Sequence, residues 1–470
     1  MTALKKFSAY LSSELKDFLR AFFSGRVYPA VVMLLVALSH IFGLEIYLGL
    51  FSIALVSLAL LVSDTARPAI PFVVSFVFQL SLKNAPGIPT YSNYLFTGAR
   101  LVFVVIFGVL LFSSAVIFSV RNRIFSGMNF KNTRMLLPLL VLSLGFLLNG
   151  AFSRGFSFPS FLYGLMQSLC YTLIFLFFSK GLKREKAEEI SEYFTYVSAI
   201  LSLTLLVELF ALYLTGNVIS DGSIVKENLL FGWGIWNTAG VSLAVLIPVI
   251  FLGVLKGKNP LFYLCVTVLT ALGIVFTMSR NALLFGALVT IICFFVGCIR
   301  GENKKLCRYT LMFALLGIAF ATIIFADEIR TVFADFTNRG FSDNGRFELW
   351  REGFNSFLCA PVFGSGFFDF SSDLTFDVAA FLPKMAHNTF IQILSCMGVF
   401  GLLCYLFYRY KSLEPFWKNP NLSKTMLLLS VLVMLGESLL DNFVFYFLPT
   451  LHYSVSLAVA ERFYEEEQNI

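Results

Sequence analysis

Long apolar runs alternate with short polar connectors along almost the whole chain. The runs fall near residues 28–43, 46–63, 68–82, 100–120, 135–150, 161–179, 193–215, 236–255, 261–278, 282–299, 309–326, 388–408, 425–441 and 444–460. A helix that crosses ~30 Å of hydrocarbon needs about 20 apolar residues. The pattern therefore predicts an all-α polytopic membrane protein with about 12–14 transmembrane helices.

The first 26 residues have a different pattern. They lack the continuous apolar core of a cleavable signal peptide. Apolar side chains recur every three to four positions with lysines and arginines between them, at Phe7, Leu11, Leu15, Phe18 and Phe22. This spacing predicts an amphipathic helix that lies on the inner membrane surface.

Composition and charge agree with the membrane interpretation. The chain has 470 residues, of which 58% are hydrophobic and 13% are charged, whereas an average soluble domain carries roughly 25% charge. These values exclude a water-soluble globular enzyme and a disordered chain. The net charge of +7 could suggest a nucleic-acid partner. In a membrane chain, however, the location of the basic residues is more informative than their sum. We therefore predict no nucleic-acid partner.

The basic residues orient the chain. With the N-terminus in the cytoplasm, the inner segments are 1–27, 64–67, 121–134, 180–192, 256–260, 300–308, 409–424 and the C-terminal tail, and they hold 25 of the 35 Lys and Arg residues. The positive-inside rule then places both termini in the cytoplasm.

One long segment, residues 327–387, is predicted to lie outside the membrane. It separates transmembrane helices 1–11 (27–326) from helices 12–14 (388–460), which precede a short cytoplasmic tail (461–470). The segment contains five basic residues, Arg330, Arg339, Arg346, Arg351 and Lys384, and its stretch 346–354 has the pattern of a short helix. Long loops on a rigid scaffold are usually functional.

Three arginines are candidates for binding an anion. Arg280 sits between two apolar runs with almost no polar connector, and an arginine so close to hydrocarbon tends to face a partner or a wet cavity. Arg339 and Arg346 lie in the outer loop, on the same side of the membrane. Guanidinium groups bind phosphate oxygens in a planar fork. The alternatives are a snorkelling Arg280 at a tight hairpin and solvated loop arginines.

His387 is the candidate base. It lies where the long loop re-enters the membrane, and a neutral imidazole can take a proton from a hydroxyl group near neutral pH. The alternative is that this segment only begins a helix capped by Asn388. Glu437 and Asp441 are one helical turn apart on a predicted helix, so they share a face. They could orient His387, pair with an arginine, or only mark the hairpin.

No metal site or cofactor is predicted. The eight cysteines are dispersed and form no CxxC motif, so small buried hydrophobic residues are the default interpretation. His40 and His452 lie within apolar runs, where packing or an interhelical hydrogen bond is expected. Cationic side chains are therefore expected to do the work of a metal.

With these residues in view, the sequence resembles the O-antigen ligase and O-antigen/capsule polymerase superfamily of membrane glycosyltransferases. The matching motifs run in the family's order, mainly between residues 261 and 410. They are Thr277-Met278-Ser279-Arg280, Gly345-Arg346 with Leu349-Trp350, Pro361 with Gly364-Ser365-Gly366, and Ala386-His387-Asn388 with Gly398-Val399-Phe400-Gly401. Trp236-Asn237-Thr238-Ala239-Gly240 is similar to the family's Asn-containing opening of a span.

The resemblance implies a GT-C-like, metal-independent, inverting transfer of a saccharide from an undecaprenyl-diphosphate carrier, outside the bacterial plasma membrane. By motif match, Arg280 and Arg346 bind the diphosphate and His387 activates or positions the acceptor hydroxyl. Arg339, Asn388, Trp350 and Glu437 complete the predicted substrate-binding set. Fixed guanidinium groups would compensate the charge that develops on the leaving diphosphate.

Two kinds of alternative remain. Within the family, a polymerase passes the growing chain to another lipid-linked unit. A ligase passes it to lipid A core or another final acceptor. We favour the polymerase. Outside it, a flippase for lipid-linked oligosaccharides also has about fourteen spans, but the two-half repeat of many transporters is absent. The expected partners are the lipid-linked donor, a glycan or glycolipid acceptor and the bilayer, with a chain-length regulator as a further candidate.

Overall fold

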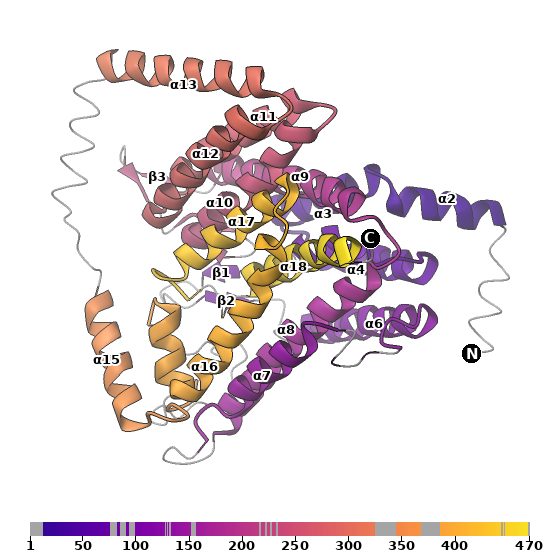
Figure 1. The fold of residues 1–470 in the computed structure, drawn as a ribbon, viewed down its shortest axis with the longest axis vertical. Coiled ribbons are helices and arrows are strands. Elements are labelled where there is room, and N and C mark those ends of the chain that lie inside the picture. Colours follow the sequence, from indigo (N-terminus) through magenta and orange to yellow (C-terminus); the bar gives the residue numbers. More distant parts are fainter. Residues whose placement is uncertain are drawn as a thin grey trace.

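The computed structural model of the protein is a bundle of helices with three short β-hairpins (Figure 1). The structure describes residues 13–75, 82–84, 91–93, 99–126, 128, 130, 133–151, 157–215, 218–220, 223–225, 228–231, 234–324, 345–367, 386–442, 445 and 447–468.

The helices of the first half are α2 (Ser13–Ser24), α3 (Val27–Phe42), α4 (Glu45–Val62), α5 (Ala69–Ser75), α6 (Ala99–Arg121), α7 (Leu136–Leu147), α8 (Phe158–Gly181) and α9 (Ala187–Thr215). Those of the second half are α10 (Trp236–Lys256), α11 (Pro260–Phe276), α12 (Arg280–Arg300), α13 (Lys304–Ile324), α15 (Arg346–Cys359), α16 (Thr389–Trp417), α17 (Leu422–Glu437) and α18 (Phe447–Gln468). The antiparallel hairpins pair β1 (Leu82–Asn84) with β2 (Tyr91–Asn93), β3 (Ile219–Ser220) with β4 (Ser223–Ile224), and β5 (Leu230–Phe231) with β6 (Gly234–Ile235).

Every apolar run in the sequence overlaps one helix, from α3 to α13 and from α16 to α18. The prediction of an all-α polytopic membrane protein is confirmed. Within the described ranges, six helices are long and apolar enough to cross a membrane: α6, α8, α9, α10, α12 and α16. A seventh span results if α2 and α3, which are bent by 66°, count as one. The remaining helices are shorter or more polar, so a total of twelve to fourteen spans is reached only if these cross as well.

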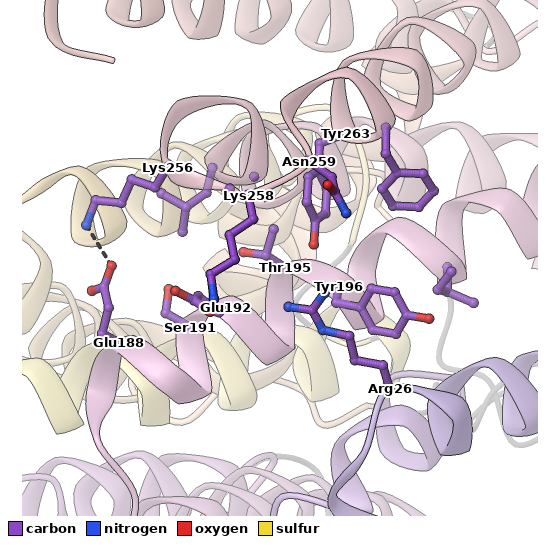
Figure 2. Close-up of a pocket in the computed structure, with 15 residues that line it drawn as sticks. Arg26, Glu188, Ser191, Glu192, Thr195, Tyr196, Lys256, Lys258, Asn259 and Tyr263 are labelled. Carbon is purple, nitrogen blue, oxygen red and sulfur yellow. Dashed lines mark hydrogen bonds and ion pairs between the residues drawn. The ribbon is translucent and has the colours of Figure 1, made fainter. Parts of the chain in front are cut away.

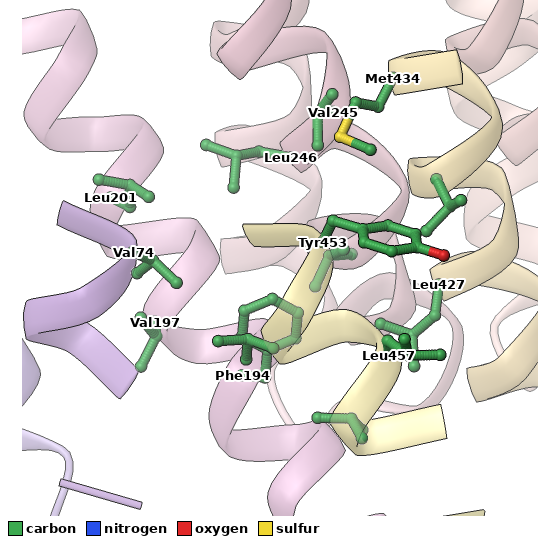
Figure 3. Packing of buried hydrophobic residues seen from close by; sticks show 14 of the residues in the cluster. Val74, Phe194, Val197, Leu201, Val245, Leu246, Leu427, Met434, Tyr453 and Leu457 are labelled. Carbon is green, nitrogen blue, oxygen red and sulfur yellow. The ribbon is translucent and has the colours of Figure 1, made fainter. Parts of the chain in front are cut away.

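Helix α10 forms the centre of the bundle. Of its apolar window, 89% is buried, and it packs against α9, α11, α12 and α17. Figure 3 shows the layer in which side chains from α5, α9, α10, α17 and α18 interlock, among them Phe194, Leu246, Met434 and Tyr453. Helix α6 is the opposite case, with only 11% of its window buried. A helix that leaves most of its apolar surface uncovered by protein fits a lipid-facing position.

The segments that the sequence assigns to the inner side gather at one end of the bundle. There Arg134 bridges Glu461 of α18 and Glu414 of α16, with N–O distances of 2.6 and 3.1 Å. Lys424 is fully buried and pairs with Glu467 at 2.9 Å. These ion pairs join helix ends that are far apart in the sequence. They therefore restrain how far one helix can slide along its neighbour.

The amphipathic N-terminal segment is helical from Ser13 to Ser24, and residues 1–12 lie outside the described part. Helix α2 leans on the end of α4, where Arg20 pairs with Asp64 at 2.9 Å. Phe23 packs with Tyr28 in a small cluster that also contains Val62.

Candidate functional site

Arg280 is the first residue of α12, directly after a tight turn. Helix α11 ends at Phe276, Met278 takes a left-handed φ of 56°, and the Ser279 side chain caps α12 by accepting from the amide of Ala282. The Arg280 side chain is exposed and forms no hydrogen bond or ion pair with another described residue. Its charge is therefore available to a ligand.

The turn before Arg280 rests on the start of α10. A Cβ added to Gly240 would lie 2.7 Å from both the Ala282 Cβ and the Thr277 Oγ1 atoms. Only glycine permits this close approach. Two motifs that are about 40 residues apart in the sequence, residues 236–240 and 277–280, are thus in direct contact.

The start of α12 also lies beside the end of α17. Phe285, about one and a half turns after Arg280, packs closely on Gly436. The next residue is Glu437, the last of α17. This contact brings Arg280 to the end of the bundle where α17 ends at Glu437 and where Asp441 and His387 lie.

His387 forms an ion-pair contact with Asp441. The imidazole Nδ1 lies 3.2 Å from the carboxylate Oδ1, and the side chains are 38% and 7% exposed. Because a carboxylate only accepts hydrogen bonds, this geometry assigns the proton of the neutral ring to Nδ1 and leaves Nε2 as an acceptor. His387 has a left-handed φ of 48°, so the backbone itself is turned to bring the ring to Asp441.

A set of hydrogen bonds joins the segment around His387 to the turn that carries Asp441. The Asn388 amide donates to Asn442 Oδ1 at 3.0 Å, and the Asn388 side chain donates to the Leu439 carbonyl at 2.9 Å. The Thr389 amide donates to the Ser438 carbonyl. Gln392 Oε1 accepts from Asn442 and from the Ala386 amide. The His387–Asp441 pair is therefore held from both sides.

Asn388 uses its side chain within the protein. Its Oδ1 accepts from the amides of Phe390 and Ile391 and so caps α16, as the capping alternative predicted. These hydrogen bonds give Asn388 a structural role, and its contact with the substrate stays a prediction.

Glu437 and Asp441 lie one turn apart at the end of α17, and the Asp441 amide donates to the Glu437 carbonyl at 2.9 Å. Helix α17 ends at Glu437, and residues 438–441 form a turn. The turn directs Asp441 to His387, whereas the Glu437 side chain is fully buried. Neither Glu437 oxygen has a hydrogen-bond partner among the described residues. The charges of Asp441 and Arg346 both act on the Glu437 carboxyl group.

Arg346 opens helix α15, the short helix that the pattern of 346–354 predicted. Gly345 precedes it with a left-handed φ of 76°. Trp350 follows one turn later and stacks edge-on against Phe347, with ring centroids 5.3 Å apart. The Trp350 indole nitrogen is buried without a hydrogen-bond partner in the described part of the chain. Arg346 itself is half-buried.

The segment that follows α15 binds to the backbone of α16 where that helix is interrupted at Gly398. Gly398 has φ 65° and ψ −167°, a conformation essentially confined to glycine. The break removes two bonds of the α-helical pattern, and residues 361–366 replace them. Ser365 and Gly366 donate to the carbonyls of Ser395 and Cys396, and Val399 and Phe400 donate to those of Pro361 and Val362, at 2.8–3.0 Å.

The structure thus brings four of the predicted site residues to one end of the bundle: Arg280, Arg346, His387 and Glu437. Trp350 lies on the same helix as Arg346. Arg339 lies outside the described residues. Sequence reasoning offered Asp441 as one of two carboxylates that could orient His387, and it assigned no role to Asn442 or Gln392. Their signal was weak, since they are ordinary amides whose role depends on contacts between separate segments.

His452 packs between α9 and α17 rather than at this site. His452 contacts Ser430 of α17 with its Nε2 3.3 Å from the hydroxyl oxygen, which is the interhelical hydrogen bond expected for it. All eight cysteines are free thiols. Among the described residues, no group of three or more His, Cys, Asp or Glu side chains could hold a metal ion.

Comparison with known families gives one match. Residues 265–406 match the family model described as O-antigen ligase. The resemblance to the O-antigen ligase and polymerase superfamily is confirmed. The matched region begins in α11 and ends within α16, so it contains Arg280, Arg346 and His387. It supports a glycosyltransferase of the O-antigen ligase or polymerase type in a multi-pass membrane protein. A search of curated proteins gives no significant match.

Proposed function

We propose that this protein is a surface-polysaccharide polymerase that transfers a glycan from an undecaprenyl-diphosphate carrier to an acceptor hydroxyl. The observation that carries the proposal is the His387–Asp441 pair at the same end of the bundle as Arg280 and Arg346. This arrangement combines a base for the acceptor with cations for the leaving group, and it lies within the region that matches the O-antigen ligase family.

In the proposed reaction the acceptor oxygen attacks the anomeric carbon of the donor. The bond from this carbon to the diphosphate oxygen breaks, and the electron pair leaves with the undecaprenyl diphosphate. His387 takes the acceptor proton on Nε2, and Asp441 stabilises the imidazolium that forms. A direct displacement of this kind inverts the anomeric configuration.

Arg280 and Arg346 are proposed to bind the diphosphate. Their guanidinium groups match phosphate oxygens in pairs, and they compensate the developing negative charge without reorganising. This role is supported by the exposure of Arg280 and by its lack of an ion pair or hydrogen bond with any other residue that the structure describes. No metal ion is needed for this charge compensation, so we propose a metal-independent transfer with no cofactor. Arg339 remains a predicted contributor.

The site is proposed to face the outside of the plasma membrane. The basic segments and their ion pairs lie at the opposite end, as the positive-inside rule requires for a cytoplasmic end. Cys359, the last residue of α15, is exposed and offers a test. A membrane-impermeant maleimide should label it in intact spheroplasts, and Cys359→Ser should remove that labelling. Labelling of Cys359 only after lysis would contradict this orientation.

The reaction itself is tested with purified protein and an undecaprenyl-diphosphate oligosaccharide. We expect longer lipid-linked glycans and free undecaprenyl diphosphate by mass spectrometry, without nucleotide and in the presence of a chelator. Loss of activity with chelator would overturn metal independence. Translocation of the lipid in proteoliposomes without a new glycosidic bond would instead identify the flippase, the alternative from another class.

Polymerase and ligase differ only in their acceptor. Cells that lack a polymerase accumulate single repeat units on the carrier, whereas cells that lack a ligase accumulate full-length polymer on it. We expect single repeats. Accumulated polymer would assign the ligase and leave the roles of His387, Arg280 and Arg346 unchanged.

A further inference from the structure

A second polar site lies at the opposite end of the bundle from His387. It is a cavity of about 280 Å³ between the ends of α3, α9, α10 and α11 (Figure 2). The glycosyl-transfer proposal does not use it. Its lining contains cations, carboxylates and hydroxyl groups, which is the composition of a binding site rather than of a packing gap.

Two helices present uncapped N-termini near the cavity. Helix α3 begins after Arg26 and α11 begins after Asn259, and neither residue makes a side-chain capping hydrogen bond. The first amides of a helix lack partners within the helix, and they carry a partial positive charge. Both ends therefore favour an anionic group in the space between them.

The floor of the cavity contains hydroxyl groups without partners. Ser191 and Thr195 line it from α9, and each is only 2% exposed. Neither hydroxyl oxygen has a hydrogen-bond partner within the described part of the chain. A buried hydroxyl without a partner costs free energy. A ligand with oxygen atoms in this position would satisfy both groups.

The charges at the mouth include both signs. Lys256 and Glu188 pair at 2.7 Å and neutralise one another. Arg26, Lys258 and Glu192 remain, and within the described ranges none of the three forms an ion pair. Figure 2 shows them around the cavity. Arg26 lies over the ring of Tyr196, with its guanidinium carbon 5.6 Å from the ring centroid.

The mouth borders apolar surface. Leu261 and Phe262, in the first turn of α11, are 63% and 38% exposed. The amphipathic helix α2 ends two residues before Arg26. Exposed apolar side chains beside a polar cavity at the helix ends are typical of the level at which lipid headgroups meet acyl chains. A lipid can place its headgroup in this cavity and its chains against α11.

We propose that this cavity binds the headgroup of a zwitterionic, phosphoethanolamine-bearing phospholipid. The phosphate contacts Arg26, Lys258 and the hydroxyls of Ser191 and Thr195, and the ammonium contacts Glu192. The two cations and one carboxylate that form no ion pair with another described residue match a phosphate joined to an ammonium better than a phosphate alone. Basic pockets between helices at a membrane surface bind lipid headgroups in this way.

Native mass spectrometry of the full-length protein in detergent tests the proposal. Phosphatidylethanolamine and phosphatidylglycerol with the same acyl chains are titrated separately. Wild type should bind phosphatidylethanolamine about 10-fold more tightly, the effect of one charge-assisted hydrogen bond. Glu192→Gln should remove this preference, whereas Lys258→Gln and Thr195→Val should weaken binding of both lipids. Lys304→Gln, which removes an exposed charge at the start of α13, is the matched control and should change neither affinity.

Three outcomes would overturn the proposal. Equal affinity for the two lipids in wild type would exclude recognition of the ammonium. Unchanged binding in Glu192→Gln, Lys258→Gln and Thr195→Val would place the lipid elsewhere. Tight binding of soluble glycerophosphoethanolamine, with no gain from acyl chains, would identify a soluble phosphodiester as the ligand instead of a lipid.

Discussion

The Nδ1 atom of His387 lies 3.2 Å from Oδ1 of Asp441, and the same Oδ1 accepts from the Asn442 amide at 2.7 Å. The hydrogen bond from the Asn442 amide therefore holds the Asp441 carboxylate in the orientation in which it contacts the imidazole. This relationship makes His387 a base whose free nitrogen has one orientation, and it makes Asp441 the residue that sets that orientation.

Asp441→Asn should lower the turnover number of glycan transfer by about 10³-fold, because the amide no longer stabilises the imidazolium and allows the wrong tautomer. The KM for the lipid-linked donor should change little, since Asp441 does not contact the diphosphate. Product formation followed by mass spectrometry measures both constants. Asp64→Asn, which removes an exposed carboxylate at the other end of the bundle, is the control. Turnover within a few-fold of wild type in Asp441→Asn would contradict the role of the pair.

Arg280→Ala and Arg346→Ala should each lower turnover by at least ~10²-fold, the usual loss when a donor that stabilises transition-state charge is removed. Arg280→Lys and Arg346→Lys should recover part of it, because lysine restores the charge but not the fork of donors. Arg300→Ala, at the other end of α12, should be nearly neutral. Near-normal rates in both alanine variants would remove the arginines from the site.

Glu437→Gln should lower turnover by about 10-fold through Arg346, whose charge acts on the buried Glu437 carboxyl group. The same change should have less than a twofold effect in an Arg346→Ala background, since residues that interact electrostatically are energetically coupled. The melting temperature of Glu437→Gln should not fall, because a buried carboxylate without a hydrogen-bond partner is costly and a neutral amide is less so. Independent, multiplicative losses in the double variant would separate the two residues.

Gly398→Ala should destabilise the protein by about 1–3 kcal/mol, the cost of a side chain in this backbone region. The added Cβ would also lie 2.4 Å from the Val362 carbonyl oxygen, so residues 361–366 would be displaced. A thermal unfolding scan in detergent should show a lower midpoint together with reduced turnover. Gly108→Ala, in open space on α6, is the matched control. An unchanged midpoint in Gly398→Ala would show that the break is not required.

The helices could be predicted from the sequence because long apolar runs between charged connectors are a local signal. Even the short α15 follows from the pattern of residues 346–354. The partner of His387 could not be predicted in the same way. Glu437 and Asp441 were equal candidates by their spacing, and only the contact between the turn after α17 and the segment around His387 distinguishes them.

The break in α16 could not be predicted from the sequence either. Four backbone groups on each side form it, and backbone groups leave no residue-specific trace in a sequence. Gly364, Gly366 and Gly398 were visible as parts of motifs, but not as parts of one contact. The cavity at the other end of the bundle is assembled from the ends of four helices, so it too depends on how separate segments meet.

The backbone bonds between residues 361–366 and α16 have a mechanical consequence. Helix α15 and the outer half of α16 form one rigid unit. Arg346 is the first residue of α15, and His387 lies two residues before the start of α16. In the proposed reaction, Arg346 and His387 move together between one donor and the next unless these four backbone bonds open. The proposed polymerase therefore keeps the separation of the two groups from one round of transfer to the next.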